Sequence, residues 1–261
     1  MISWDADQYL RFERERTQAC IDLVHRVELS DPRRIVDLGC GPGNSTAILR
    51  ARWPKSDILG VDNSNEMLER ARSTDAGVAW ELADLRAWHP DGVFDLVFSN
   101  AAFQWLPNHG ELIPRLWAAT ASGGALAFQV PAPGDHRTRW LEAIRVVLAR
   151  PRWSRVTPED PAGETVLTLD EYYGLLSKGS RRVDLWDTAY VHVLPEPRAV
   201  VEWVKGTGLR PVLSQLSEEE RRTFLSEFTE EIERVYPRQS DGRVLFPFLR
   251  RFVVAYRAPN E

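Results

Sequence analysis

Three glycines at alternate positions mark the segment IVDLGCGPGNST, residues 35–46. Gly39, Gly41 and Gly43 follow a short apolar run typical of a buried strand, and a helix-like segment comes after them. Glycine has no Cβ, so the chain can turn tightly and approach a ligand, while the next helix offers unpaired backbone N–H groups. This pattern predicts a loop that holds a nucleotide or a similar molecule. The dinucleotide fingerprint GxGxxG fits poorly, because the third glycine comes one residue early.

Polar side chains recur where later strands should end. Asp62 ends ILGVD, where a carboxylate can accept hydrogen bonds from both hydroxyls of a ribose. Asp84 follows a third strand and could accept from the exocyclic amine of a purine, and Asn100 ends a fourth, FDLVFSN, shortly before Gln104 and Trp105. Each position has an ordinary structural alternative: Asp62 can cap the next helix, Asp84 can be a solvated turn residue, and Trp105 can belong to the core.

The elements that position these residues alternate regularly in the first half of the chain. We predict strands at 34–38, 57–61, 78–82, 94–99 and 124–130, separated by segments long enough for helical crossovers. Such alternation predicts a parallel sheet with helices on both faces. Ligands bind beyond the carboxyl ends of the strands in open sheets of this kind. The glycine loop and the three polar positions all fall at that edge.

The pattern changes after residue 130. Residues 131–182 are rich in Pro, Arg and Trp and predict two helices, one near 138–149 and one opened by Thr168, whose spacing to Glu171 matches a capping box. A strand at 183–193 and helices at 197–205 and 217–235 should follow, the second helix opened by Ser217 in the capping sequence SEEE. A last strand is expected at 251–256, after Pro247, because proline removes a ladder donor.

One domain with a helical cap after the fifth strand accounts for these elements. We expect an α/β fold with a seven-stranded, mostly parallel sheet. Its parts should be an N-terminal helical segment at 1–30, a core at 31–130, a cap or lid at 131–182 and 195–240, and closing strands at 183–194 and 243–257.

Composition excludes several classes of protein. The chain has 261 residues, 43% of them hydrophobic, which is enough for a substantial core. A net charge of -5 argues against a large basic face for nucleic acid, and no apolar run approaches the roughly 20 residues that span a bilayer. Without a secretory signal, and with Cys20 and Cys40 as the cysteines, we expect a soluble cytoplasmic protein without disulfides. The five histidines show no metal-ligand spacing, so no metal is expected. The sequence leaves monomer and homodimer open.

Four motifs carry a resemblance to a known family. DLGCGPGNST, GVDNSNEML, ADLRAW and FSNAAFQWLP are similar, in order and near the expected spacing, to the successive motifs of class I S-adenosylmethionine-dependent methyltransferases. More narrowly, the chain resembles the small-molecule carboxylate O-methyltransferases that act on trans-aconitate. That likeness rests on W-x-x-x-x-Y-L-x-F near the start, RWP, KGTGLRP and LFPFLRRFVVA. It spans residues 4 to about 257 and is weakest at 131–182.

The resemblance implies a Rossmann-like fold, S-adenosyl-L-methionine as cofactor, and a set of contacts to it. The loop after the first strand would approach the methionine part, with the preceding aspartate on its amino group. The second strand end would hold the ribose, and a methionine one turn later would pack on the adenine. The third strand end would read the adenine edge. The implied cofactor residues are Asp37, Gly39, Cys40, Gly41, Asp62, Asn63, Met67, Asp84, Leu85 and Asn100.

An ionised carboxylate acceptor would need no general base, since its unperturbed pKa is about 4. We therefore expect residues that position the acceptor rather than an acid or base, with Asn100, Gln104, Trp105 and His109 as candidates. A polycarboxylate also needs cationic partners, and the planar fork of arginine suits a carboxylate. The acceptor-binding candidates are Arg210, Arg250 and Arg251 first, then Arg11, Arg14, Arg16, Tyr9, Tyr172 and Tyr173.

Other functions share much of this pattern. A related methyltransferase could act on a malonyl thioester, a lipid or terpenoid acid, or a carbon acid, with the same cofactor residues. A non-catalytic S-adenosylmethionine-binding protein would also keep them. The glycine spacing and the absence of a Tyr/Lys proton-relay pair argue against an NAD-dependent oxidoreductase.

Overall fold

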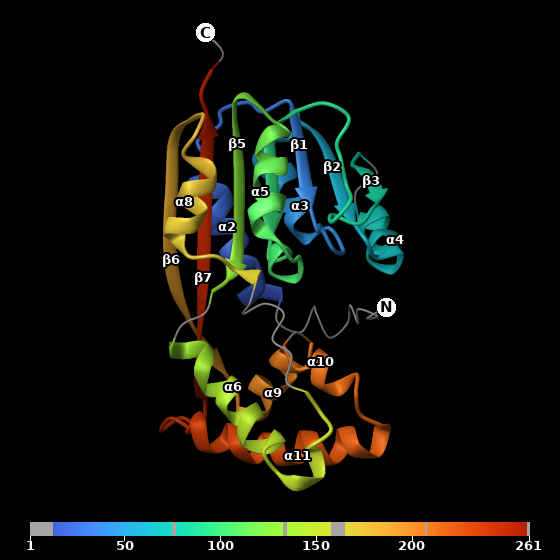
Figure 1. Cartoon of the computed structure of the whole chain (residues 1–261), viewed down its shortest axis with the longest axis vertical. Helices are drawn as coiled ribbons and strands as arrows, with labels where there is room; N and C mark the ends of the chain where they lie inside the picture. Colours follow the sequence, from blue (N-terminus) through green and yellow to red (C-terminus); the bar gives the residue numbers. More distant parts are fainter. Residues whose placement is uncertain (1–12, 75–76, 133–134, 158–164, 207, 260–261) are drawn as a thin grey trace.

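A seven-stranded sheet in the order β3-β2-β1-β4-β5-β7-β6 forms the centre of the protein in a computed structural model (Figure 1). The structure describes residues 13–74, 77–132, 135–157, 165–206 and 208–259. Pairs along β3-β2-β1-β4-β5 are parallel, and β7 is antiparallel to β5 and to β6. The predicted seven-stranded, mostly parallel sheet is confirmed. The strands are β1 Arg34–Leu38, β2 Asp57–Asp62, β3 Ala79–Leu82, β4 Phe94–Asn100, β5 Thr120–Pro131, β6 Ser180–Leu194 and β7 Val244–Arg257.

Helices cover both faces of the sheet, which explains why its central strands are apolar on both sides. In β1, Ile35 packs in the core beneath α2 (Glu13–Arg26) and α3 (Asn44–Arg52). The next residue, Val36, packs in the core on the opposite face, beneath α5 (His109–Ala118) and α8 (Leu169–Leu176). Because successive strand residues point to opposite faces, both must be apolar when each face is covered. Helix α4 (Asn65–Thr74) follows β2.

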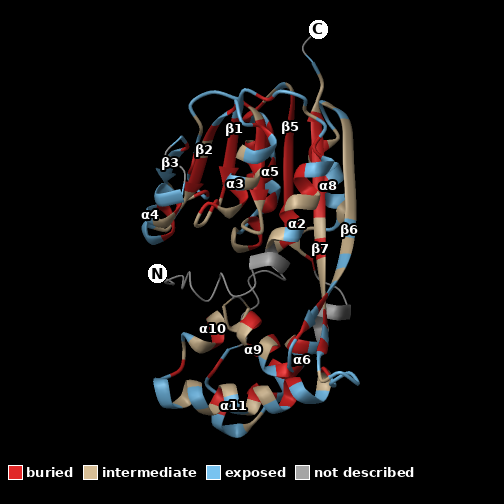
Figure 2. Ribbon diagram, turned by 180° about the vertical axis from the view of Figure 1, so that it is seen from behind, coloured by how far each residue is buried: buried red, intermediate tan, exposed pale blue. Residues whose placement is uncertain are grey.

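A third core lies at the far end of the molecule, among α6, α9, α10 and α11 (Figures 1 and 2). We call this part the cap. Its elements are α6 Asp135–Leu148, the 3₁₀ turn η2 Pro151–Trp153, α9 Pro197–Lys205, α10 Arg210–Leu213 and α11 Glu218–Val235. Phe224, Phe228 and Ile232 form the buried stripe of α11, and the ends of β6 and β7 extend into the same core through Leu194 and Phe246. The capping boxes at Thr168 and Ser217 are both present.

One part of the expected cap belongs to the sheet instead. Tyr172 and Leu176 of α8, with Val166 just before it, pack in the same core as α5. The expectation that all of 131–182 forms a cap is therefore corrected: α6 and η2 lie in the cap, and α8 covers the sheet. The sequence of α8 shows that one face is apolar, but not which surface that face meets.

The last strand is longer than predicted. It runs through Pro247, which lies opposite Val191 of β6. The β5 pairing stops at Arg250, so at Pro247 the strand has a paired neighbour on one side. A strand tolerates proline where no ladder hydrogen bond is needed.

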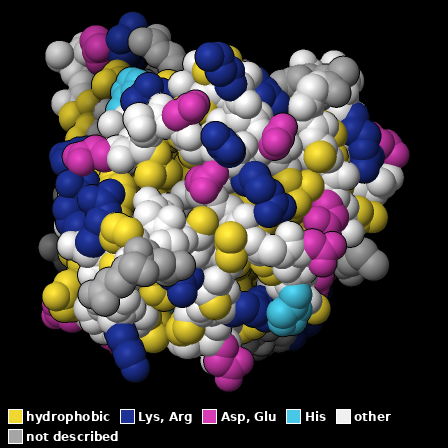
Figure 3. All heavy atoms as spheres, turned by 90° about the horizontal axis from the view of Figure 1, so that it is seen from above, with side chains coloured by type: hydrophobic (Ala, Val, Ile, Leu, Met, Phe, Trp, Pro, Cys, Tyr) yellow, Lys and Arg dark blue, Asp and Glu magenta, His cyan; other side chains and the backbone are white. Residues whose placement is uncertain are grey.

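The end of the molecule away from the cap has an interspersed surface of basic and acidic side chains (Figure 3). Among the described residues, no helix combines the length and the apolar character that crossing a membrane requires.

Candidate active site

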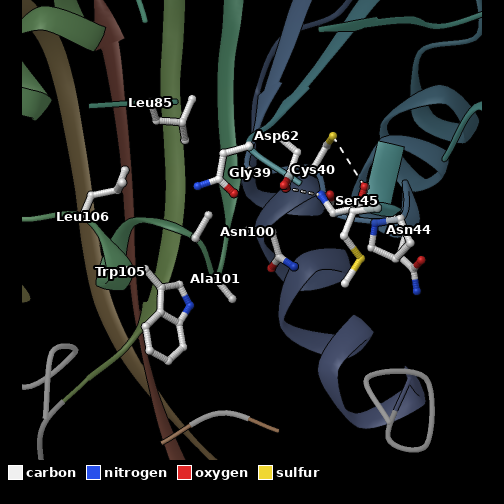
Figure 4. A pocket seen from close by; sticks show the side chains of 15 residues that line it. Gly39, Cys40, Asn44, Ser45, Asp62, Leu85, Asn100, Ala101, Trp105 and Leu106 are labelled. Atoms are coloured by element: carbon white, nitrogen blue, oxygen red, sulfur yellow. Dashed lines mark hydrogen bonds between the residues drawn. The ribbon is translucent and has the colours of Figure 1, made fainter. Parts of the chain in front are cut away.

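A cavity opens beyond the carboxyl ends of β1, β2 and β4, on the side of the sheet that faces the cap. In Figure 4, Trp105 and Leu106 stand on one side of it and Asn44 and Ser45 on the other. Eight of the ten predicted cofactor residues line it: Gly39, Cys40, Gly41, Asp62, Asn63, Met67, Leu85 and Asn100. The predicted positioning residue Trp105 lines it too. Sequence reasoning missed Pro42, Asn44, Ser45, Ala101, Ala102 and Leu106.

Two glycines of the loop after β1 have different tasks. Gly39 has φ +71, and a Cβ there would lie 2.2 Å from the Cβ of Ala102. Its small size therefore lets the loop after β4 pack closely against it. Gly41 has φ +55, and a Cβ there would meet no heavy atom within 4 Å. Because Gly41 lines the cavity, its bare backbone leaves room for a bound molecule.

Asp62 joins the loop after β1 to the loop after β2. One carboxylate oxygen accepts from the N–H of Gly41 at 2.9 Å, and the other accepts from the N–H of Ser64 at 2.9 Å. Burial raises the pKa of Asp62, and the backbone hydrogen bonds oppose that rise. Each carboxylate oxygen can accept more than one hydrogen bond, so Asp62 could also accept from ligand hydroxyls.

Asp37 lies behind the loop and is not among the described lining residues. It is fully buried, and one of its oxygens accepts from the hydroxyls of Ser45 at 2.7 Å and Thr46 at 2.6 Å. Its other oxygen has no hydrogen-bond partner. Burial raises the pKa of Asp37 to about 6, against the opposing effect of the two hydroxyls. In this structure the side chain holds the first turn of α3 in place.

The loop after β3 contributes Leu85 to the cavity, whereas Asp84 forms an ion pair within the same loop. The Asp84 carboxylate pairs with Arg86 and is not among the described lining residues. Arg115 of α5 donates to the carbonyls of Leu85 at 2.6 Å and Arg86 at 2.9 Å. The guanidinium thus fastens this loop, which sequence reasoning missed because an arginine in the last turn of a helix is ordinary.

The end of β4 is held in an uncommon conformation. Ala101 has φ +55, a left-handed value rare for residues other than glycine. Its N–H donates to the backbone carbonyl of Gln129 at 2.9 Å, and its carbonyl accepts from the side-chain amide of Gln104 at 2.6 Å. Gln104 is buried and is not among the described lining residues, so it acts on the backbone of this turn.

His109 is a structural residue in this fold and not a wall of the cavity. It is buried, with Nε2 2.9 Å from the carbonyl of Phe103 and Nδ1 2.7 Å from the hydroxyl of Tyr172. A carbonyl can only accept, so Nε2 donates, and Nδ1 accepts from Tyr172. Burial lowers the pKa of His109. The expectation that His109 positions an acceptor directly is corrected.

The candidate arginines lie outside the described lining of the cavity. Arg251 makes a two-pronged ion pair with Asp187, at 2.9 and 2.8 Å, and donates to the carbonyl of Leu167 at 2.7 Å, so its charge is already compensated. Arg250 is buried over the ring of Phe248 at 4.5 Å. Arg210 begins α10.

The remaining acceptor candidates divide into two groups. Tyr172 belongs to the core, and Tyr173 is 53% exposed. Tyr9 and Arg11 fall outside the described residues, as do the side chains of Arg14 and Arg16. Within the described part of the chain, no group of three or more His, Cys, Asp or Glu side chains could hold a metal ion.

Comparison with known proteins decides the family. A family model described as a methyltransferase domain matches residues 12–160. Over 98% of this chain and 100% of the relative, the chain is 46% identical to trans-aconitate 2-methyltransferase of Azoarcus sp. (strain BH72). It is 40% identical to that of Escherichia coli (strain 55989), over 98% and 99% of the two chains. The chain belongs to the trans-aconitate 2-methyltransferase family.

Solved structures support the fold assignment of this family member. YcgJ of Bacillus subtilis is similar with a TM-score of 0.60 and 14% identity, over 93% of this chain and 100% of that one. A phosphoethanolamine N-methyltransferase of Haemonchus contortus, solved with S-adenosylhomocysteine, has a TM-score of 0.54 and 16% identity. That match covers 93% of this chain, which spans 53% of the Haemonchus protein.

Proposed function

We propose that this chain is an S-adenosyl-L-methionine-dependent O-methyltransferase that esterifies one carboxylate of a small polycarboxylic acid, with trans-aconitate as the first acceptor to test. The observation that carries the proposal is the cavity at the carboxyl ends of β1, β2 and β4. The choice of acceptor is supported by sequence identities of 40% to 46% to trans-aconitate 2-methyltransferases over 98% of this chain.

The residues present suit the cofactor. Gly41 offers a bare backbone beside open space, and Asp62 is a partly buried carboxylate that can accept from ribose hydroxyls. Met67 and Leu85 supply apolar wall for an adenine ring. When bound, the cofactor supplies a methyl group activated by a sulfonium.

The titratable side chains of the cavity fit an acceptor that needs no base. Among the described lining residues these are Cys40 and Asp62. Burial raises the pKa of the Cys40 thiol, which therefore stays protonated at neutral pH, and both oxygens of Asp62 accept from the backbone. A carboxylate is already ionised at neutral pH. The protein's part is to place the acceptor oxygen in line and keep water away, for which Trp105 and Leu106 supply apolar surface.

Direct assay tests the proposal. Protein is incubated with methyl-labelled S-adenosyl-L-methionine and a panel of di- and tricarboxylates, and label in a base-labile ester is counted. We expect ester formation with trans-aconitate. Ester formation with only a monocarboxylic lipid or a carrier-bound acid would reject the polycarboxylate assignment.

A variant of Asp62 tests the cofactor site separately from the acceptor. Asp62→Ala should weaken S-adenosylhomocysteine binding by roughly 1.5 to 3 kcal/mol, because it removes a charged hydrogen-bond acceptor. Calorimetry measures the loss. Unchanged affinity in a folded variant would contradict the place given to Asp62.

Arg250 is our first candidate for the cationic partner of a carboxylate that is not methylated, and Arg210 is the second. Arg251, the third arginine of the sequence prediction, pairs with Asp187, and Arg250 and Arg210 also have interactions of their own. Arg250→Ala should lower kcat/KM for the acid by the equivalent of roughly 2 to 5 kcal/mol while cofactor affinity stays near wild type. Arg250→Lys should recover part of the loss, and Arg243→Ala, at an exposed position near the start of β7, is the matched control.

A further inference from the structure

We propose that Gln129 is a positioning residue that turns the side-chain amide of Asn100 so that its N–H groups face the cavity and bind the reacting carboxylate. This inference rests on the proposed function and adds the group that meets the acceptor there. Asn100 lines the cavity, and Gln129 is fully buried on the neighbouring strand.

The strand register brings the two amides together. Asn100 of β4 lies opposite Gln129 of β5. The Gln129 Nε2 donates to the Asn100 Oδ1 at 2.6 Å. A carboxamide carries its oxygen and its nitrogen on opposite prongs. With the oxygen of Asn100 turned toward Gln129, its two N–H donors are left on the other side.

The reverse orientation would be less favourable. If Asn100 donated to Gln129, the Gln129 NH₂ group would lose its acceptor inside the sheet. In the structure the unpaired atom is instead the Gln129 oxygen. Proteins leave buried carbonyl oxygens unpaired more often than buried N–H groups. The buried environment of Gln129 therefore selects the orientation in which Asn100 presents donors.

The backbone around Asn100 is fixed as well. The carbonyl of Gln129 accepts from the N–H of Ala101, and Gln104 donates to the Ala101 carbonyl. These hydrogen bonds hold Ala101 at φ +55 and leave Asn100 little freedom to move away from Gln129. Hydrogen bonds within the protein therefore hold the amide in place.

The charge of the cavity gives this orientation its chemical consequence. Asp62 is the charged side chain among the described lining residues, and it is negative. A carboxylate acceptor accepts hydrogen bonds and donates none, so an inward-facing Asn100 oxygen would repel it. Inward-facing N–H groups can instead bind the carboxylate. A neutral amide also leaves more charge on the attacking oxygen than a guanidinium would.

The orientation can be measured without any turnover. In protein labelled with ¹⁵N, the side-chain protons of Gln129 should exchange slowly with solvent. Those of Asn100 should exchange faster and shift when trans-aconitate is added to the complex with S-adenosylhomocysteine. Slowly exchanging Asn100 protons with fast Gln129 protons would overturn the proposal.

Kinetics then test the consequence. Gln129→Met keeps the size of the side chain but removes its hydrogen bonds, so kcat/KM for the acid should fall roughly tenfold or more. The Kd of S-adenosylhomocysteine should stay within about threefold, since Gln129 acts on the acceptor end. A Gln129→Glu variant can donate only when its carboxyl is protonated, so its kcat/KM relative to wild type should fall as the pH rises.

Ser99→Ala is the matched control. Ser99 is the buried residue before Asn100 and donates to the Leu38 carbonyl at 2.8 Å, so its loss perturbs the same strand without touching the amide. Ser99→Ala should leave the ratio of acid kcat/KM to cofactor affinity unchanged. The proposal would be overturned if Gln129→Met lost cofactor affinity and acid affinity equally. It would also be overturned if kcat/KM of Gln129→Met for the acid stayed within twofold of wild type. If wild type esterifies no acid at all, the proposed function fails and the acceptor role of Asn100 fails with it, while the exchange measurement still decides the amide orientation.

Discussion

At the scale of single residues, the close approach of two loops sets the requirement for glycine at position 39. Gly39→Ala should destabilise the protein by roughly 2 to 5 kcal/mol, because the new Cβ meets Ala102 in a left-handed conformation that already disfavours a side chain. Gly41→Ala, with a similar φ and no atom within 4 Å, should cost only about 1 to 2 kcal/mol. Urea unfolding of the cofactor-free protein measures both.

A second substitution checks the cause. In the Gly39→Ala background, Ala102→Gly removes the atom at 2.2 Å and should restore most of the difference between the two single variants. Equal costs at the two glycines, or no recovery in the double variant, would show that the contact with Ala102 is not the reason for Gly39.

Asp37 gives the protein a defined pH dependence. Its pKa is raised from 3.8 to about 6, so the folded protein binds this proton more tightly than the unfolded chain does. The stabilisation that comes from this tighter proton binding is complete below pH 3.8, and it is lost as the pH rises through about 6. The unfolding free energy of wild type relative to Asp37→Asn should therefore increase by roughly 1 kcal/mol from pH 7 to pH 5.

The comparison with Asp37→Asn isolates this group from others that titrate in the same range. Burial lowers the pKa of His109, which has the opposite effect on stability in acid but is present in both proteins. Asp57→Asn, at an exposed position on the same sheet, is the control. Parallel wild-type and Asp37→Asn curves would contradict the prediction.

The sequence predicted where polar residues stand but not where their side chains point. It placed Asp62, Asp84 and Asn100 at strand ends, yet Asp84 pairs with Arg86 and is not among the described residues that line the cavity. The residue types of Ala101 and Leu106 do not indicate a binding site, because these two residues contribute only backbone and apolar surface to the wall of the cavity. Such contacts depend on the path of a loop, which the order of residue types does not specify.

At the scale of elements, hydrogen bonds from α8 and α5 hold the 3₁₀ turn η1 (Phe103–Trp105) that bears Trp105. The N–H of Leu167 donates to the Tyr172 hydroxyl at 3.4 Å, which donates to His109, which in turn donates to the Phe103 carbonyl. A separate hydrogen bond joins the Thr165 hydroxyl to the Gln104 carbonyl at 2.9 Å. The wall of the cavity thus depends on α8, far along the sequence.

Removal of one hydroxyl tests this dependence. Tyr172→Phe should cost about 1 to 2 kcal/mol of unfolding free energy, because it leaves His109 Nδ1 buried without a donor. Amides 103–106 should then exchange faster with solvent. Tyr173→Phe, on the exposed side of the same helix, should change neither quantity, and a Tyr172→Phe variant that matches it would contradict the role of this hydroxyl.

Local signals predicted elements better than their partners. The capping boxes at Thr168 and Ser217 mark two helix starts because the residues that cap a helix lie within one turn. The same local pattern placed α8 in the cap, although it packs on α5. Both the cap core and the core beneath α5 are apolar, so an apolar helix face does not by itself specify which of them α8 meets.

At the scale of the whole molecule, the cap and the sheet have separate cores joined by the long strands β6 and β7. In Figures 1 and 2, α10 lies on the side of the cap that faces the sheet, while α8 lies on the sheet itself. If the cap closes over the acceptor, the two helices should respond differently to ligands, because only the cap would move.

Hydrogen exchange with and without ligands tests closure. With S-adenosylhomocysteine and trans-aconitate both bound, amides of residues 208–216 should exchange more slowly than with S-adenosylhomocysteine alone, because closure shields that side of the cap from water. Amides of α8 should not change, since this helix packs against α5 and β6 on the sheet and not in the cap. Comparing α10 with α8 in both complexes separates closure of the cap from a general gain in stability, because a general gain would slow exchange in both helices. Equal protection of α8 and α10, or identical exchange of α10 in the two complexes, would mean that the cap is already in its working position before the acceptor binds.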